Sequence, residues 1–198
     1  MNSRRPSLND KSSCNPSGSI KTMILATADD LFYREGIRAV GVDRLSAVAG
    51  VAKATLYQHF GTKEKVVLAY LEARHNKVLD SLTPLPNSAD VYARIGHVFD
   101  LLEEKAVNPE FRGCAFLLAA SEHPNVAPII AMASRHKRAI RDHLLTLLHE
   151  HMADRHECAV QIALLYDGAL ASLTIHRDPA AISAARDAAM RLVASYLR

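Results

Sequence analysis

The side chains of residues 53–65, "KATLYQHFGTKEK", include several types that bind nucleic acid, crowded into a short segment. Lys53 could donate to guanine and Gln58 could pair with adenine if a helix presents them to the major groove. Small neighbouring residues would permit close approach, and an alanine methyl can contact a thymine methyl. Phenol, imidazole and ammonium groups suit phosphate contacts, which set register and give salt-dependent affinity. The small residues are Ala52 and Ala54. The groups suited to phosphate belong to Tyr57, His59, Lys63 and Lys65.

Two short helices must position these side chains. Apolar spacing predicts helices over about residues 43–49 and 53–60, and Gly50 between them supplies the positive φ that a tight turn needs. The apolar seam is expected at Leu45, Val48, Val51, Leu56 and Phe60. When those side chains point inward, the residues left on the outer side of the second helix are Lys53, Ala54, Thr55, Tyr57, Gln58 and His59. The pattern predicts a helix-turn-helix, and the alternative is a three-helix cap whose polar residues merely face water.

Helical spacing also recurs through the rest of the chain, and no segment alternates like a strand. We therefore predict an all-α protein with about nine helices. The first follows a cap at Ser19 and ends at Gly36, and a fourth, about 62–81, is capped by Thr62. Later helices are expected at about 90–105, 114–121, 126–152, 157–175 and 179–197. The domains are then a disordered tail (1–18), a helix-turn-helix domain (19–65) and a second domain (66–198), connected by the fourth helix.

Composition and charge narrow the class of protein. The chain has 198 residues, of which 49% are hydrophobic and 23% charged, enough for one good core. We find no apolar run long enough to span a membrane and no secretory signal in the first residues. Three sparse cysteines (Cys14, Cys114 and Cys158) indicate a reducing cytoplasm. Up to Lys77 the chain carries twelve Lys/Arg against seven Asp/Glu, and afterwards twelve against fourteen, which favours an anionic partner for the first part.

The stretch "GIRAVGVDRLSAVAGVAKATLYQHFGTKEKVVLAYL" resembles the DNA-binding domain of TetR-family transcriptional regulators. The shared motifs are Ala49-Gly50-Val51, Thr55-Leu56-Tyr57, His59-Phe60 and Lys63-Glu64, within a similarity that covers about residues 20–75. The resemblance implies an all-helical homodimer whose three N-terminal helices bind a palindromic double-stranded operator. The remaining helices would hold a small-molecule effector and form the dimer interface, and repression is the default in this family.

By this resemblance, the DNA-facing positions are Lys53, Ala54, Thr55, Tyr57, Gln58, His59 and Lys63, with Arg44 a further candidate on the second helix. The family's second helix usually starts with Thr or Ser, whose hydroxyl can cap the helix and touch phosphate. Here the start reads Gly41-Val42, so Val42 offers only its backbone amide.

Two C-terminal helices are candidates for the dimer interface. Residues 157–175 are rich in small side chains, and residues 179–197 carry apolar side chains at a heptad-like spacing. The predicted interface comprises Tyr166, Ala169, Leu170, Leu173, Ile182, Ala185, Ala189, Leu192 and Tyr196. The alternative is that both stripes belong to the core of a single chain.

An effector pocket is expected in the bundle from about residue 90 to 152, because apolar walls with a few polar groups suit a small organic ligand. The candidate lining is Val98, Phe99, Leu102, Phe111, Cys114, Phe116, Leu118, Met132, His136 and Tyr166. Each of these residues could instead be simple core. Cys114 opens a helix after Arg112-Gly113, a setting that can activate a thiol, although a packed small hydrophobe is the alternative.

Neither a metal, a cofactor nor an enzymatic reaction is expected. Zinc could be bound by His149, His151, His156 and Cys158 only if the helix ended near Met152 and the loop after it folded back. The chain contains no Gly-rich phosphate loop, nucleophile elbow or His-Glu-x-x-His signature. The sequence therefore predicts a DNA-binding regulator that responds to a small molecule. The alternative is the same dimer acting as a thiol, electrophile or metal sensor through Cys114 or the His149–Cys158 segment.

Overall fold

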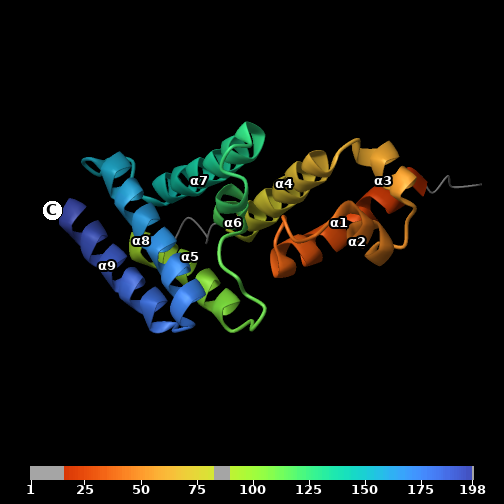
Figure 1. Ribbon diagram of the computed structural model, residues 1–198. Coiled ribbons are helices and arrows are strands. Elements are labelled where there is room, and N and C mark those ends of the chain that lie inside the picture. The colour runs from red at the N-terminus through yellow and green to blue at the C-terminus, as the bar shows by residue number, and fades with distance from the viewer. Residues whose placement is uncertain (1–15, 83–89, 198) are drawn as a thin grey trace, which may run out of the picture.

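The computed structural model describes residues 16–82 and 90–197, and within them the chain forms nine helices and no strand. They are α1 (Pro16–Glu35), α2 (Val42–Val48), α3 (Lys53–Phe60), α4 (Lys63–Ser81), α5 (Val91–Ala106), α6 (Ala115–Glu122), α7 (Ala127–Leu147), α8 (Arg155–His176) and α9 (Ala180–Tyr196). Helices α1–α3 lie at one end of the molecule, and α8 and α9 lie at the other (Figure 1). The all-α prediction is confirmed.

Local capping explains several helix starts. The Thr62 side chain accepts a 3.2 Å hydrogen bond from the backbone N–H of Lys65, and Asp90 caps α5 by accepting 2.7 Å from that of Ala93. Gly36 takes a φ of 95° after the last residue of α1, a conformation that glycine adopts without a steric penalty.

The two largest differences from the predicted helix boundaries are at the start of α1 and the end of α7. Helix α1 begins at Pro16 rather than after Ser19, since proline is tolerated in the first turn. Helix α7 ends at Leu147 rather than near Met152, because Leu148 adopts an extended conformation with ψ 153°. Most of the predicted tail (1–15) and residues 83–89, which contain two prolines and follow the fourth helix, lie outside the described residues.

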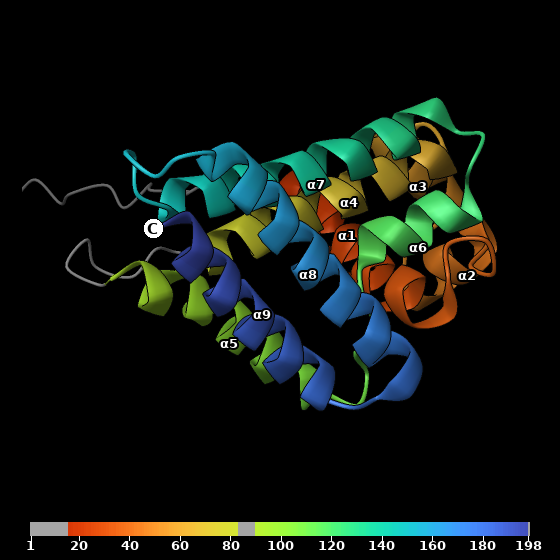
Figure 2. The same cartoon turned by 90° about the vertical axis from the view of Figure 1, so that its left-hand side faces the viewer.

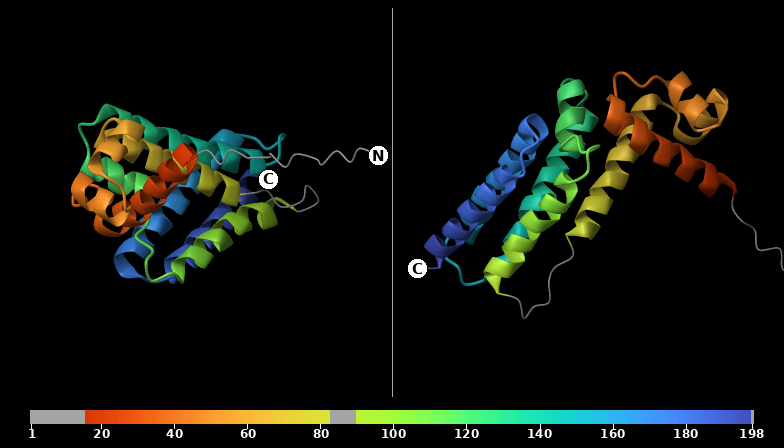
Figure 3. Two further views of the ribbon diagram at one scale, coloured as in Figure 1. Left: turned by 90° about the vertical axis from the view of Figure 1, so that its right-hand side faces the viewer. Right: turned by 90° about the horizontal axis from the view of Figure 1, so that it is seen from below.

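The buried side chains form two cores. One joins α1–α4 to α6 and the start of α7, and it includes Ala115, Phe116, Ala119, Ile129 and Met132. The other fills the space between α5, the end of α7, α8 and α9, which pack side by side (Figure 2). Helix α4 packs against both α1 and α7 and runs from one group to the other (Figure 3). The predicted boundary after residue 65 therefore does not follow the packing, because α6 completes the N-terminal core.

Helix α8 is, among the described ranges, the one helix long and apolar enough to cross a membrane by length and composition. Charged and polar residues such as Glu157 and Asp167 interrupt α8, so it meets this criterion without containing the continuous apolar run that the sequence analysis looked for. Core helices of globular proteins meet the same criterion, and seven side chains of α8 are buried in the second core.

Candidate nucleic-acid interface and adjoining cavity

Helices α2 and α3 form the predicted helix-turn-helix. Gly50 joins them with a φ of 65°, and its N–H donates 3.2 Å to the carbonyl oxygen of Ala47. Leu45 and Leu56 are almost fully buried and fix the pair against α1. A positive φ would strain a larger residue at position 50, so the turn depends on this glycine.

The expected apolar seam is wrong at Val48, which is 55% exposed. Helix α2 has only seven residues, and its inward side carries Leu45 and Ser46, followed by buried Ala49 at its end. The buried Ser46 hydroxyl is satisfied by donating 2.8 Å to the carbonyl oxygen of Val42. The inward stripe therefore passes through Ala49, and Val48 turns to the surface beside it.

The predicted DNA-facing residues of α3 gather on its outer side. Ala52, Lys53, Ala54, Tyr57 and Gln58 are exposed, whereas Thr55 and His59 are partly buried. Helix α3 lies at the end of the molecule farthest from α8 and α9 (Figure 1). Neither Gly41 before α2 nor Ala52 before α3 makes a side-chain cap hydrogen bond, so first-turn N–H groups remain available to an anion.

Two of the predicted DNA-contacting cations are paired within the chain. Lys53 Nζ lies 2.7 Å from an oxygen of Asp43, and hydrogen bonding to this carboxylate raises the pKa of Lys53. Arg44 binds Glu35 through two nitrogens, at 2.8 and 2.5 Å. These pairs are exposed to solvent and stabilise the fold little, so a phosphate could replace the carboxylates.

Lys63 is placed differently from the prediction. Its Nζ turns inward and donates 2.6 Å to the carbonyl oxygen of Ile37, and burial lowers the pKa of this lysine. Lys63 therefore tethers the start of α4 to the loop after α1, whereas Lys65 stays exposed in the same first turn.

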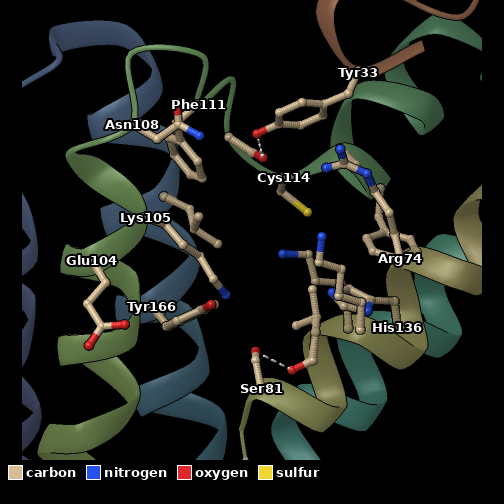
Figure 4. Close-up of a pocket in the computed structure, with 17 residues that line it drawn as sticks. Tyr33, Arg74, Ser81, Glu104, Lys105, Asn108, Phe111, Cys114, His136 and Tyr166 are labelled. Atoms are coloured by element: carbon tan, nitrogen blue, oxygen red, sulfur yellow. Dashed lines mark hydrogen bonds between the residues drawn. The ribbon is translucent and has the colours of Figure 1, made fainter. Parts of the chain in front are cut away.

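A cavity of about 430 Å³ lies between the two cores (Figure 4). The structure brings five of the predicted lining residues together around it: Phe111, Cys114, Phe116, His136 and Tyr166. The other five predicted lining residues lie outside it: Val98, Phe99, Leu102, Leu118 and Met132. Those on α5 are wrong because that face packs into the second core, while Glu104, Lys105 and Asn108 face the cavity instead.

The sequence prediction missed the cavity residues that come from α1 and α4. Tyr33 reaches the cavity from α1, and α4 contributes Arg74, Lys77, Val78 and Ser81. The Arg74 guanidinium stacks 3.8 Å from the centre of the Tyr33 ring. The candidate segment was limited to residues 90–152 and one later tyrosine, so no signal within it could identify these groups.

His136 lines the cavity and is paired with the buried His75. The Nδ1 atoms of His75 and His136 lie 3.1 Å apart, which requires one to donate and the other to accept. The Phe116 ring stacks on His136 with centroids 3.6 Å apart. Burial lowers the pKa of His136 to about 3, so this imidazole is uncharged at neutral pH.

The loop at the cavity is bonded directly to α1. The Tyr33 hydroxyl donates 3.0 Å to the carbonyl oxygen of Gly113 and accepts 2.8 Å from the N–H of Arg112. The Arg112 guanidinium donates to the carbonyl oxygen of Arg34. A carboxylate oxygen of Glu122, at the end of α6, accepts 2.7 Å from the N–H of Arg38. The loop at the cavity and the end of α6 are therefore hydrogen-bonded to α1 and to the loop that leads from α1 to α2.

The predicted dimer interface mostly lies inside the chain. Buried members of that set are Tyr166, Ala169, Leu170, Leu173, Ile182, Ala185 and Ala189, while Leu192 and Tyr196 are partly buried. They pack between α5, α8 and α9, so the core alternative holds for these side chains. A different stripe of α8 faces outward and contains Val160, Leu164, Gly168 and Ile175.

The two cysteines within the described ranges differ in access. Cys158 is fully buried, and burial raises the pKa of its thiol. The sulfur of Cys114 points into the cavity (Figure 4). Nowhere in residues 16–82 and 90–197 does a group of three or more His, Cys, Asp and Glu side chains lie where it could hold a metal ion.

Comparison with known proteins gives consistent matches. Residues 24–70 match the family model described as bacterial regulatory proteins of the tetR family. The transcriptional activator FasR of Mycolicibacterium smegmatis is 31% identical over 85 residues, which make up 40% of this chain and 39% of FasR. The chain thus matches less than half of that relative's length.

Solved structures match over nearly the whole chain. SCO4454, a TetR-family transcriptional regulator from Streptomyces coelicolor, is 29% identical with a TM-score of 0.81, and the match covers 91% of this chain and 97% of that one. Escherichia coli NemR in its reduced form has a TM-score of 0.79 at 18% identity, and the match covers 87% of this chain and 96% of that one. At this identity the similarity supports the fold alone.

Proposed function

We infer that this chain is a regulator of the TetR family of bacterial regulatory proteins, whose members are DNA-binding transcription factors and not enzymes, and from this premise we propose its mode of action. The protein binds a palindromic operator as a homodimer, represses transcription there, and is released when a small organic effector enters the cavity. A regulator of this kind acts in the cytoplasm. The observation that carries the proposal is Tyr33, which belongs to the DNA-binding end and also lines the cavity.

Coupling between the cavity and the DNA follows from that shared residue. An occupant that displaces Tyr33 or the 112–113 loop must disturb the hydrogen bonds that hold α1 against α6. A ligand shifts a conformational equilibrium only by its differential affinity for the two states. An effector that fits best when α1 is rotated would therefore change the separation of the two helix-turn-helix units in a dimer and weaken operator binding.

Base reading is assigned to the exposed side of α3. Lys53 and Gln58 are suited to base edges, and Tyr57, His59 and Lys65 to phosphates. The exposed Ala54 methyl lies on the same side and can approach thymine. Arg44 on α2 is a further phosphate contact once it leaves Glu35.

The outward stripe of α8 supports dimerisation. Leu164 is 67% exposed and Ile175 is 74% exposed, which is unusual for large aliphatic side chains on a core helix. Gly168 lies between them, and a methyl group added at this glycine would meet nothing within 4 Å, so a second helix could approach closely there. Two copies of α8 and α9 would bury this stripe as a four-helix interface.

Repression is the default of this family, whereas FasR is named as an activator. The two outcomes depend on where the operator lies relative to the promoter. A reporter fused to the selected operator, with and without the gene for this protein, decides between them. Higher reporter output in the absence of the protein supports repression, and lower output supports activation.

The DNA-binding proposal is tested by selecting tight binders from random duplexes with the purified protein and sequencing the winners. A palindrome with a fixed half-site spacing is the expected result. Enrichment of no sequence, with binding lost at moderate salt, would mean that the basic surface binds DNA non-specifically.

A second candidate, a thiol or electrophile sensor, is favoured by one observation: the sulfur of Cys114 faces the cavity. In this version an electrophile releases the operator by modifying Cys114. Loss of DNA binding on treatment with N-ethylmaleimide, and its retention in Cys114→Ser, is the expected pair of results. An unchanged response in Cys114→Ser removes this candidate.

A further inference from the structure

We propose that the effector is an organic anion, with a carboxylate-sized charged head and an apolar body, whose charge is bound by Lys105 and Lys77. This inference rests on the proposed function, because it names the ligand class of the same cavity. It goes beyond the family assignment, which specifies no ligand. The cavity's charge, its unpaired cations and its aromatic wall each support it.

The cavity lining is strongly basic. It contains four cationic side chains against one carboxylate: Arg74, Lys77, Lys105 and Lys137 against Glu104. The neighbouring His136 is neutral and adds no charge. A concave site with an excess of positive charge attracts anions, and low-dielectric walls strengthen that attraction.

Two of the four cations already have partners within the chain. Arg74 is paired with Asp29 and also stacks on Tyr33. Lys137 Nζ lies 2.5 Å from an oxygen of Asp167. These two positive charges are neutralised locally, so they contribute less to a ligand site than the other two.

Lys105 and Lys77 are left without such partners. In the part of the chain that the structure describes, neither ammonium group has a carboxylate or other hydrogen-bond acceptor within bonding distance. Lys105 is partly buried, and burial lowers its pKa, while Glu104 raises it and Lys77 lowers it further. Two neighbouring ammonium groups that repel each other at a cavity favour an anion, which would neutralise them and satisfy their donors.

The rest of the cavity suits an apolar body. Phe111, Phe116, Tyr166 and Leu170 supply aromatic and aliphatic wall, and Figure 4 shows Lys105 and Tyr166 reaching in from one side, opposite Arg74 and His136. The volume of about 430 Å³ falls within the range of drug-sized ligand sites. An aromatic or short aliphatic acid therefore fits better than an inorganic anion or a bare hydrocarbon.

The test compares two fluorescent probes that differ in one charged group. 1-Anilinonaphthalene-8-sulfonate carries a sulfonate on an aromatic body, and N-phenyl-1-naphthylamine is the same body without it. Titration into the purified full-length dimer, with no DNA present, should give at least about tenfold tighter binding of the sulfonate. Equal or weaker binding of the sulfonate would overturn the proposal.

Charge-changing variants locate the site. Lys105→Met should weaken sulfonate binding at least about tenfold and leave the neutral probe within about twofold. Glu104→Gln should tighten sulfonate binding, because it removes the one carboxylate of the lining. The matched controls are Arg38→Met and Glu103→Gln, two exposed charges outside the lining that should change neither probe. If Lys105→Met does not fold, the opposite shift in Glu104→Gln still decides the question.

Failure of this inference is separable from failure of the proposed function. A protein that selects a palindrome but binds the neutral probe better keeps its regulatory role and has an uncharged effector. A protein that binds the sulfonate through Lys105 but selects no DNA has the anion site without the operator. Insensitivity of sulfonate binding to both Lys105→Met and Glu104→Gln would refute the site.

Discussion

The phenolic hydroxyl of Tyr33 donates a 3.0 Å hydrogen bond to the carbonyl oxygen of Gly113, 80 residues away in the sequence. This bond joins α1, which supports the helix-turn-helix, to the loop that opens α6 beside the cavity. Gly113 is held there with a φ of 86°, a conformation that other residues adopt only with strain. The link between the two halves therefore depends on a residue with no side chain.

Gly113→Ala should destabilise the protein by about 2–4 kcal/mol, because it combines backbone strain with overpacking. The added methyl would collide with the side chain of Thr174. Denaturant unfolding followed by circular dichroism measures the loss. Gly41→Ala is the control, since φ there is −75° and nothing lies within 4 Å of the new methyl. A Gly113→Ala protein as stable as the control would contradict this role.

Lys63 and Lys65 should behave oppositely although they are two residues apart. Lys65 is exposed, so Lys65→Gln should remove one phosphate contact and reduce the slope of log affinity against log salt by about 0.9. Lys63→Gln should leave the slope unchanged and instead lower the melting temperature, because its Nζ donates to the carbonyl oxygen of Ile37. Anisotropy of a labelled duplex at several salt concentrations separates the two. A smaller slope in Lys63→Gln would restore it as a phosphate contact.

Leu164→Glu should dissociate the dimer. A carboxylate placed at the centre of the outward stripe of α8 would be buried opposite its own copy, which should raise the dimer dissociation constant at least about tenfold. Sedimentation velocity over a concentration series gives this constant. Leu117→Glu, on α6 and also exposed, is the control and should remain dimeric. If both variants sediment as the wild type does, the interface lies elsewhere.

Stability should fall as the pH is lowered from about 6.5. His136 has its pKa lowered to about 3 in the folded chain, so below about 6.5 the unfolded chain binds a proton that the folded chain does not. Each pH unit in this window should cost up to about 1.4 kcal/mol. His136→Gln should flatten the dependence between pH 6 and 4, while exposed His149→Gln should not. Equal slopes in all three proteins would show that His136 is not the titrating group.

The elements that sequence reasoning placed well are those determined locally. The α2–α3 turn needs a glycine at position 50, and the polar residues of α3 fall on one side because the helix is short and its inward residues are few. Capping by Thr62 is also a local property. None of these features requires knowledge of which helix packs against which.

The features that sequence reasoning missed depend on tertiary packing. Tyr33 and Arg74 reach the cavity because α1 and α4 cross it, which no spacing within those helices reveals. Apolar residues on α8 form two stripes, and only the packed structure tells which one is buried. Lys63 resembles any surface lysine in sequence, and its inward turn follows from the position of Ile37.

The central claim, that occupying the cavity weakens operator binding, can be tested without knowing the effector. Val78→Trp would fill part of the cavity from α4, and Val107→Trp adds the same bulk at a position that is 83% exposed and outside the lining. The measurement is the anisotropy of the selected duplex titrated with each folded, dimeric variant. The account predicts at least about tenfold weaker binding by Val78→Trp and wild-type binding by Val107→Trp. Wild-type affinity in Val78→Trp would contradict it.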